Sequence, residues 1–437
     1  MSENTKVDHH PDGGKIDPDY PLQIVPAHAR KSLTSLGLVL LGFTFFTPTM
    51  LAGAGIAPSF SFSEFLLVAL LGSLVLGVYV SALGAIGART GLTTVVMSRY
   101  AFGDGGSKLV SVLLGGTQIG WYGVTVATLA LLTQQVTGWE GRTALWVLIV
   151  VGGAVMGATA YFGYRGMELL SAVSVPLLLI LAGWVTWRSL TEIGAAGGLG
   201  AIVGTGEMTV AVAVTAIVGT FVSGGTQAPN WTRFARTPAQ GLGASAIAFF
   251  IGELLMIFFG GIGALAFGIG DFVEVLFALN LIGWGLVFLV ANLWTTNDNT
   301  AYNFGVAGAE LFNANTKKPF VIGGVIIGTL LAIPIYDNLI GYLAWLGILI
   351  PAVGGVIIGD YLANWRGGMP EPLEYDFPTV RWENLGVYAV ATFVAWLSSR
   401  NGWFIPPVNG IVLAVLGSWI VGIRGRASLA GDPVGAG

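Results

Sequence analysis

Twelve apolar stretches, each long enough or nearly long enough to cross a lipid bilayer, dominate the sequence. Crossing about 30 Å of hydrocarbon takes roughly 20 residues of helix. With 54% apolar and only 10% charged residues among 437, the chain lacks the polar surface that a soluble protein needs. We therefore expect an all-α polytopic membrane protein with twelve transmembrane helices. The stretches are 33–56, 62–88, 109–136, 143–162, 167–187, 208–226, 240–267, 281–304, 320–335, 339–363, 382–398 and 404–423.

The positions of the basic residues fit this number of spans. If the N-terminus is cytoplasmic, sixteen of the nineteen lysines and arginines fall on the cytoplasmic side, and only Arg142, Arg188 and Arg400 fall outside. Membrane proteins show this excess of positive charge on their cytoplasmic side. We expect an integral protein of the plasma (inner) membrane with both termini in the cytoplasm.

Two spans contain residues that interrupt a helix near the middle of the membrane. The first span has Gly42 and Pro48 around a Phe-Thr-Phe-Phe-Thr segment, and the sixth has Gly219, Gly224 and Gly225. Proline removes a backbone donor and glycine weakens a helix. An opened backbone is tolerated in lipid only where it is buried or lines a cavity. A proline kink with close glycine packing is the ordinary structural alternative.

The two interrupted spans are five apart, so they occupy equivalent places if spans 1–5 and 6–10 are repeats. An odd number of crossings per repeat makes the two repeats inverted, and such paired breaks mark the binding site of many transporters. The predicted organisation is a disordered cytoplasmic tail (1–31), a first five-helix repeat (32–190), a second inverted repeat (207–364), two additional helices (382–424) and a cytoplasmic tail (425–437).

The residue types that enzymes and metal sites use are scarce in the spans. The chain has no cysteine, and its histidines, His9, His10 and His28, all lie in the N-terminal tail. Catalysis or a bound metal in the membrane is therefore not expected, and the apolar, charge-poor composition argues against nucleic-acid binding. No cofactor is expected either. Among acidic residues, Glu253 lies deep in the seventh span and could relay protons, whereas Glu310 is near a span end and is expected to be solvated.

The eighth span carries a row of amide and hydroxyl groups. Asn292, Thr295, Thr296 and Asn299 follow a spacing that places them on one helix face. Their oxygens suit a hard cation such as Na⁺. Hydrogen bonds between helices are the structural alternative, since Thr and Asn commonly join helices in lipid.

The third span places an amide and an indole on one face near its centre. Gln118 and Trp121 are three residues apart, at a depth where tryptophan is unusual. An indole face beside an amide can hold a flat heteroaromatic ring by stacking and edge hydrogen bonds, and Phe221 in the sixth span could supply the opposite face. A tryptophan packed into glycine gaps is the alternative.

These motifs resemble the nucleobase–cation symporter-1 family and, within it, the cytosine permease branch. The resemblance covers nearly all of the membrane region. The segments that carry it are 41–46 (LGFTFF), 87–94 (GARTGLTT), 114–121 (LGGTQIGW), 293–299 (LWTTNDN) and 351–361 (PAVGGVIIGDY).

The resemblance implies a leucine-transporter-like fold, a 5+5 inverted repeat with discontinuous helices 1 and 6, and sodium-coupled uptake of cytosine or a close pyrimidine. It implies that the base lies between Trp121 and Phe221, and that the sodium ion is co-transported without a resident cofactor. The implied base-edge partners are Gln118, Asn292 and the backbone around Thr220, Ser223 and Gly224. The implied sodium ligands are carbonyls around Gly42, Phe43 and Phe46, the Asn292 backbone and the hydroxyls of Thr295 and Thr296.

The sequence departs from the branch at residues 220–226 and at Glu253, which stands where a neutral residue is usual. Proton-coupled transport of a related nucleobase, a hydantoin or a hydroxymethylpyrimidine therefore stays open as an alternative, as does a passive channel or facilitator.

Overall fold

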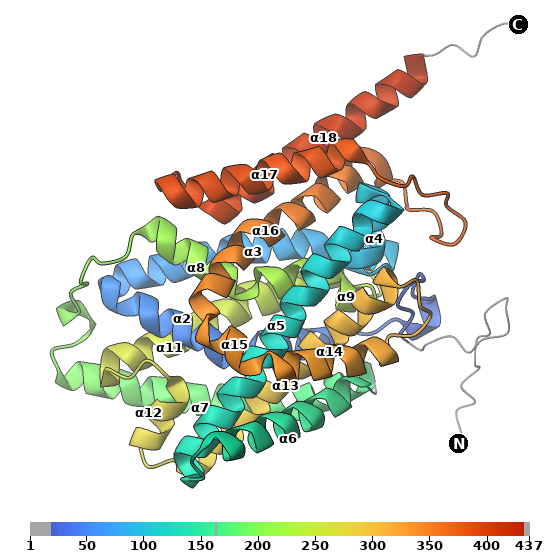
Figure 1. The fold of residues 1–437 in the computed structure, drawn as a ribbon. Coiled ribbons are helices and arrows are strands. Elements are labelled where there is room, and N and C mark those ends of the chain that lie inside the picture. Colours follow the sequence, from blue (N-terminus) through green and yellow to red (C-terminus); the bar gives the residue numbers. More distant parts are fainter. Residues whose placement is uncertain (1–18, 162–163, 432–437) are drawn as a thin grey trace, which may run out of the picture.

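The computed structural model describes residues 19–161 and 164–431, and within these ranges it is built from helices without a β-strand (Figure 1). Its helices are α1 (Leu33–Thr44), α2 (Thr47–Ile56), α3 (Phe62–Thr90), α4 (Thr94–Phe102), α5 (Asp104–Thr137), α6 (Arg142–Tyr161), α7 (Tyr164–Ala195), α8 (Val210–Thr226), α9 (Pro229–Thr232), α10 (Pro238–Ala246), α11 (Glu253–Phe267), α12 (Phe272–Ala278), α13 (Ile282–Leu311), α14 (Lys318–Leu330), α15 (Ala332–Asp337), α16 (Leu339–Asp360), α17 (Trp382–Asn401) and α18 (Pro406–Gly431). A π-helical turn, Ile247–Gly252, joins α10 to α11.

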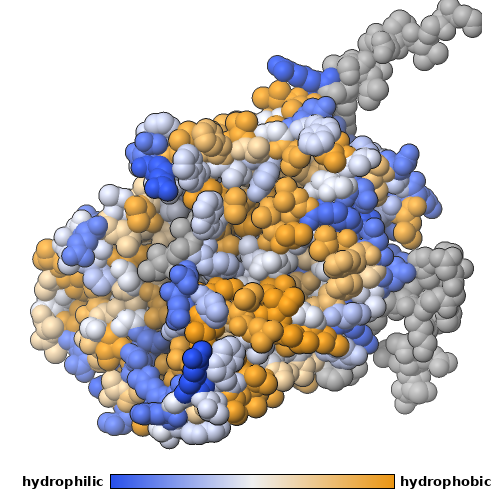
Figure 2. Space-filling view, viewed as in Figure 1, coloured by the Kyte–Doolittle hydropathy of each residue, from blue (hydrophilic) through white to orange (hydrophobic). Residues whose placement is uncertain are grey.

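Every predicted apolar stretch coincides with one of these helices or with consecutive ones. Within the described part of the chain, seven helices are long and apolar enough to cross a membrane, or eight if the bent pair α1–α2 is counted as one span. The full number of twelve crossings remains a prediction. Apolar side chains cover much of the surface seen in Figure 2, as expected for a surface that faces lipid.

The first span is broken where the sequence predicts it. Ser32 caps the start of α1 by accepting a hydrogen bond from Ser35 N. The helix ends at Thr44 because Phe45 and Phe46 adopt extended backbone conformations, and α2 resumes in a direction 57° away. Pro48 lies in the first turn of α2, where its missing N–H costs no helical hydrogen bond.

The sixth span is interrupted later than the sequence predicts. The helix α8 continues through Gly219, Gly224 and Gly225 and ends at Thr226, before the short helix α9 begins at Pro229. Gly224 instead provides room for a ring, because a Cβ there would lie 2.5 Å from Phe43. The interruption lies at Gln227, whose backbone leaves helical geometry, whereas Ala228 directly before Pro229 stays helical.

The glycines of α2 and α11 allow these helices to touch through their backbones. A Cβ at Gly53 would lie 2.1 Å from the Ile257 carbonyl oxygen, and one at Gly260 would lie 1.9 Å from the Met50 carbonyl oxygen. The second half of the broken span is thereby held tightly against α11. At the other end of the chain, α17 and α18 pack against α16 (Figure 1).

Residues 19–31 differ from the disordered tail that the sequence predicts. Asp19 is buried and forms an ion pair of 3.0 Å with Lys317, while Arg233 donates hydrogen bonds to the carbonyls of Asp19 and Tyr20. The Lys31 N–H donates to the Phe234 carbonyl. This segment therefore ties the start of the chain to the region after α9 and to the loop before α14. The remainder of the predicted tail, residues 1–18, lies outside the described residues.

The C-terminal helix is longer than predicted, since α18 continues past residue 423 to Gly431. The end of the predicted C-terminal tail, residues 432–437, lies outside the described residues.

Candidate functional site

A small, partly enclosed cavity lies beside the break between α1 and α2. Its volume is about 10 Å³, roughly the space that one water molecule needs. Segments that are far apart in the sequence meet here: the broken first span, α5, α8 and α13. The lining residues are Phe43, Phe46, Gln118, Trp121, Thr220, Phe221, Gly224, Thr296 and Thr300.

Aromatic rings form most of one side of this cavity. Phe46 contacts both predicted stacking partners edge to face, with ring centroids 5.4 Å from Trp121 and 5.8 Å from Phe221. Phe46 lies in the extended segment between α1 and α2 and is 2% exposed. A flat ring can therefore enter between Trp121 and Phe221 only if Phe46 moves.

Polar groups of α5, α8 and α13 line up beside these rings. The Gln118 amide nitrogen donates to Ser223 Oγ at 2.8 Å, and Ser223 Oγ lies 2.6 Å from Thr117 Oγ1. Asn303 Nδ2 is 3.5 Å from Gln118 Oε1, and Asn230 donates to Asn303 at 2.7 Å. This chain of contacts fixes which end of the Gln118 amide donates, so that an edge of the pocket presents a defined pattern of donors and acceptors.

Asn292 uses its side chain to hold the broken span. Its Oδ1 accepts hydrogen bonds of 2.7 Å from both the N–H and the hydroxyl of Thr47, and its Nδ2 donates to the Phe45 carbonyl at 2.7 Å. Asn292 is absent from the cavity lining. The structure therefore places its side chain at the helix break, away from the edge of the base that the resemblance implies.

Oxygen atoms gather where α13 faces the end of α1. Thr296 Oγ1 lies 3.1 Å from the Phe43 carbonyl oxygen and 3.4 Å from that of Phe45. The Thr295 hydroxyl has one proton, which it can donate to the carbonyl of Ala291 at 2.9 Å or to that of Asn292 at 3.0 Å on its own helix, and this leaves lone pairs of its oxygen to accept a cation. Hard cations of the size of Ca²⁺, which Na⁺ nearly matches, bind oxygens at about 2.3–2.6 Å, so neighbouring ligand oxygens lie about 3.3–3.7 Å apart.

Most predicted site residues therefore meet around the cavity and the break. Gln118, Trp121, Thr220, Phe221 and Gly224 line the cavity together with Phe43, Phe46 and Thr296. Ser223 lies behind this lining and contacts it by accepting a hydrogen bond from Gln118. Gly42 packs against Ser171 of α7. Sequence reasoning missed the Phe45 carbonyl and the polar contacts of Thr300 and Asn303. Thr300 follows Thr296 by four residues on α13, and this i, i+4 spacing could have extended the predicted row of amide and hydroxyl groups to Thr300.

Glu253 begins α11 directly behind the cavity wall. It is completely buried, and its Oε1 lies 2.6 Å from the hydroxyl oxygen of Thr220, which lines the cavity. Within the described ranges its Oε2 has no hydrogen-bond partner. An acidic side chain is therefore separated from the place expected for the ligand by a single residue, Thr220.

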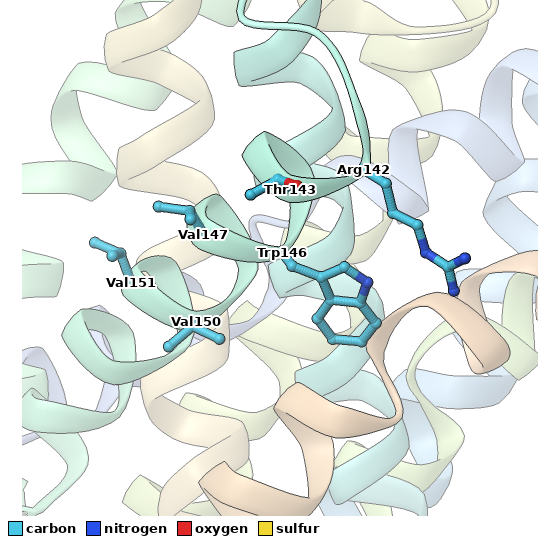
Figure 3. A pocket seen from close by; sticks show the side chains of 6 residues that line it. All are labelled: Arg142, Thr143, Trp146, Val147, Val150 and Val151. Atoms are coloured by element: carbon cyan, nitrogen blue, oxygen red, sulfur yellow. The ribbon is translucent and has the colours of Figure 1, made fainter.

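A larger hollow lies on the outer surface of α6 and is of a different kind. Figure 3 shows its lining side chains projecting from successive turns of this helix, and its volume is about 570 Å³. Val147, Val150 and Val151 are each more than a third exposed there. Because the surface is apolar and open, it fits the part of a membrane protein that lipid covers. The lining residues are Arg142, Thr143, Trp146, Val147, Val150 and Val151.

Comparison with known proteins places this arrangement in a family. Residues 24–422 match the model of a family described as permeases for cytosine/purines, uracil, thiamine and allantoin. The chain is 39% identical over 392 residues to the cytosine permease of Escherichia coli K12, covering 89% of this chain and 90% of that protein. It is 24% identical over 381 residues to the hydantoin permease of Microbacterium maritypicum, covering 75% and 73% of the two chains.

Solved structures share the fold. Mhp1, a nucleobase-cation-symport-1 family transporter in a closed conformation with bromovinylhydantoin bound, matches with a TM-score of 0.78 at 18% identity, covering 94% of this chain and 95% of that one. A sodium-coupled sialic acid symporter matches with a TM-score of 0.67 at 11% identity, covering 93% and 92%. The fold is thus the leucine-transporter-like fold that the resemblance implies, while the inverted repeat itself remains a prediction. The relatives are named as permeases, in agreement with the exclusion of an enzyme. The chain is an integral membrane transporter and belongs to the permease family for cytosine, purines and related compounds, within the cytosine permease branch of the nucleobase–cation symporters.

Proposed function

We propose that this protein imports cytosine, or a close pyrimidine nucleobase, by sodium-coupled symport with alternating access. The observation that carries the proposal is the proximity of two sites at one helix break. Aromatic faces and a fixed amide line the cavity on one side, and a group of neutral oxygens lies on the other. The likeness to cytosine permeases across most of the chain supports the choice of substrate.

The cavity has the chemistry of a site for a flat polar ring. Trp121 and Phe221 offer faces for stacking, and base–aromatic stacking is worth about 1–3 kcal/mol per base. Gln118 supplies one amide donor and one acceptor beyond its contacts to Ser223 and Asn303. A base binds in this scheme after Phe46 leaves the space between the two faces.

The two distances from Thr296 Oγ1 to carbonyl oxygens at the break are close to the spacing expected of a site for Na⁺. In the proposal the cation is bound by the carbonyls of Phe43 and Phe45, the Asn292 carbonyl and the hydroxyls of Thr295 and Thr296. The distance of 3.4 Å between Thr296 Oγ1 and the Phe45 carbonyl oxygen falls within the spacing of ligand oxygens around one ion. The distance of 3.1 Å to the Phe43 carbonyl oxygen is slightly shorter, so these two oxygens would have to move apart a little when the ion binds. The predicted carbonyls of Gly42 and Phe46 remain candidates beside them.

Both ligands would act on the same segment, and this gives a physical route to coupling. A cation bound between α13 and the end of α1 would set the position of the extended residues Phe45 and Phe46, and the Phe46 ring must leave the stacking residues before a base can bind. If sodium thereby raises the affinity for the base, the base must raise the affinity for sodium by the same factor. Alternating access would follow from movement of one helix group against the other around this site.

Uptake of radiolabelled cytosine into proteoliposomes tests the proposal. We expect accumulation above the external concentration when a sodium gradient points inward, and only equilibration without the gradient. Equal uptake under both conditions would contradict sodium coupling, and failure to exceed the external concentration under any gradient would favour a passive channel or facilitator. In cells we propose that the protein lies in the plasma membrane with both termini cytoplasmic, which protease protection of terminal tags can test.

Glu253 favours one second candidate. A buried acidic side chain behind the cavity suits a proton-coupled transporter of a related nucleobase, a hydantoin or a hydroxymethylpyrimidine. A panel of these compounds scored by thermal shift, with and without sodium, separates the candidates, because a ligand that binds the folded protein stabilises it more the further its concentration exceeds its Kd.

A further inference from the structure

The hydroxyl group of Thr220 has one proton but two oxygen atoms within hydrogen-bond distance. Its Oγ1 lies 2.6 Å from the Ile217 carbonyl oxygen and also 2.6 Å from Glu253 Oε1. A threonine hydroxyl has a single proton to donate. If Glu253 were ionised, one of these two short contacts would bring oxygen lone pairs together without a hydrogen between them. If Glu253 is a neutral acid, its own O–H donates to Thr220, and Thr220 donates to Ile217.

The surroundings of Glu253 also favour the neutral acid. Its side chain is 0% exposed and its Oε2 has no hydrogen-bond partner among the residues that the structure describes. An ionised carboxylate is costly to bury unless it is paired and fully hydrogen-bonded.

Among the side chains that the structure describes, no charged group on the helices that pack on α11 forms an ion pair with this carboxyl. The helix α2, the π-helical turn and the 3-10 turn Ala57–Ser59 contain no titratable residue. The titratable groups that the structure describes on the other three helices that pack against α11 form no hydrogen bond or ion pair with the carboxyl. They are Glu64, Tyr79 and Arg89 on α3, Glu168, Arg188 and Glu192 on α7, and Glu274 on α12.

We propose that Glu253 and Thr220 form a proton-binding site against the base cavity, and that closing the cavity takes up one proton from water onto the Glu253 carboxyl. This inference rests on the proposed function, since it links the proton to base binding. A base can enter only if the cavity opens on one side, because the closed cavity has space for about one water. Water that reaches Thr220 lies one hydrogen bond from Glu253, so the open state lets the carboxyl ionise. Closure removes the water, and the carboxyl retains a proton that it returns to water on reopening.

The first test needs no ligand. We expect the infrared spectrum of the full-length protein in nanodiscs, at neutral pH, to contain the C=O band of a protonated carboxylic acid that shifts in D₂O and is lost in Glu253→Gln. Glu64→Gln is the matched control, since Glu64 is exposed at the start of α3 and caps it, and this variant should keep the band. A spectrum in which Glu253→Gln removes no such band, both without ligand and with saturating cytosine and sodium, refutes the proposal.

The second test measures linkage. At a fixed sodium concentration, the affinity of the unmodified protein for cytosine should fall about tenfold for each unit of pH increase over the range where only the open state is ionised. Glu253→Gln, which mimics the neutral acid, should bind cytosine with the low-pH affinity at every pH. An affinity of the unmodified protein that does not change with pH overturns the proposal, as does loss of cytosine binding in a folded Glu253→Gln protein. If cytosine binds at no pH, the proposed substrate fails while the infrared band still decides whether Glu253 is protonated.

Discussion

Replacing Thr296 by alanine tests the cation site most directly. The substitution removes an oxygen that lies 3.1 Å from the Phe43 carbonyl and 3.4 Å from that of Phe45, on the face of α13 that meets the break. A buried contact to a charged partner is worth about 1.5–3 kcal/mol, so the affinity for Na⁺ should fall by about 10–150-fold. Because the coupling is reciprocal, sodium should then raise cytosine affinity at correspondingly higher concentrations.

The assay is binding of labelled cytosine by the purified protein across a sodium titration, with potassium keeping the ionic strength constant. Thr296→Ser is the matched control, because it keeps the hydroxyl and should retain the sodium midpoint within a few-fold. Cytosine affinity without sodium reports damage to the cavity, which Thr296 also lines. An unchanged sodium midpoint in Thr296→Ala would show that this oxygen is not a ligand.

Three further substitutions test the packing and the base site. Trp121→Ala should weaken cytosine binding by about 1–3 kcal/mol through lost stacking, whereas Trp121→Phe should keep most of it; equal affinities in equilibrium binding would exclude a stacked base. Phe46→Leu should strengthen cytosine binding, because two ring contacts worth about 0.5–1.5 kcal/mol each no longer compete with the base, and weaker binding in the same assay would mean that Phe46 itself holds the ligand. Gly260→Ala should destabilise the protein by about 1–3 kcal/mol in thermal unfolding, since its Cβ would meet the Met50 carbonyl at 1.9 Å. Gly263→Ala, with the nearest atom 3.8 Å away, should not, and equal stability of the two variants would refute the close contact between α2 and α11.

The sequence predicts the features that depend on local pattern. Hydrophobic length locates the helices, and the segment Gly42–Pro48 marks the break at Phe45 and Phe46, because proline and glycine act on the backbone next to them. Helical spacing places Thr296 and Asn292 on the face of α13 that meets this break.

Features that depend on a distant partner were not predictable from the pattern. The sequence does not show whether Gly224 interrupts the helix or makes room for an aromatic ring. The outcome depends on Phe43, which lies in another span. Glu310, expected in solvent, is buried beside Arg99 and Lys108, with ion pairs of 2.9 and 3.1 Å. These outcomes follow from tertiary packing between residues far apart in the chain.

The anchored segment before α1 has a practical consequence for handling this transporter. Since Asp19 pairs with Lys317, and Arg233 donates hydrogen bonds to the carbonyls of Asp19 and Tyr20, a bulky fusion joined close to Asp19 would strain contacts between the segment before α1 and residues far along the polypeptide. A reporter placed there would disturb these packed contacts themselves. Labels intended to leave the cycle undisturbed therefore need a long spacer ahead of this anchor.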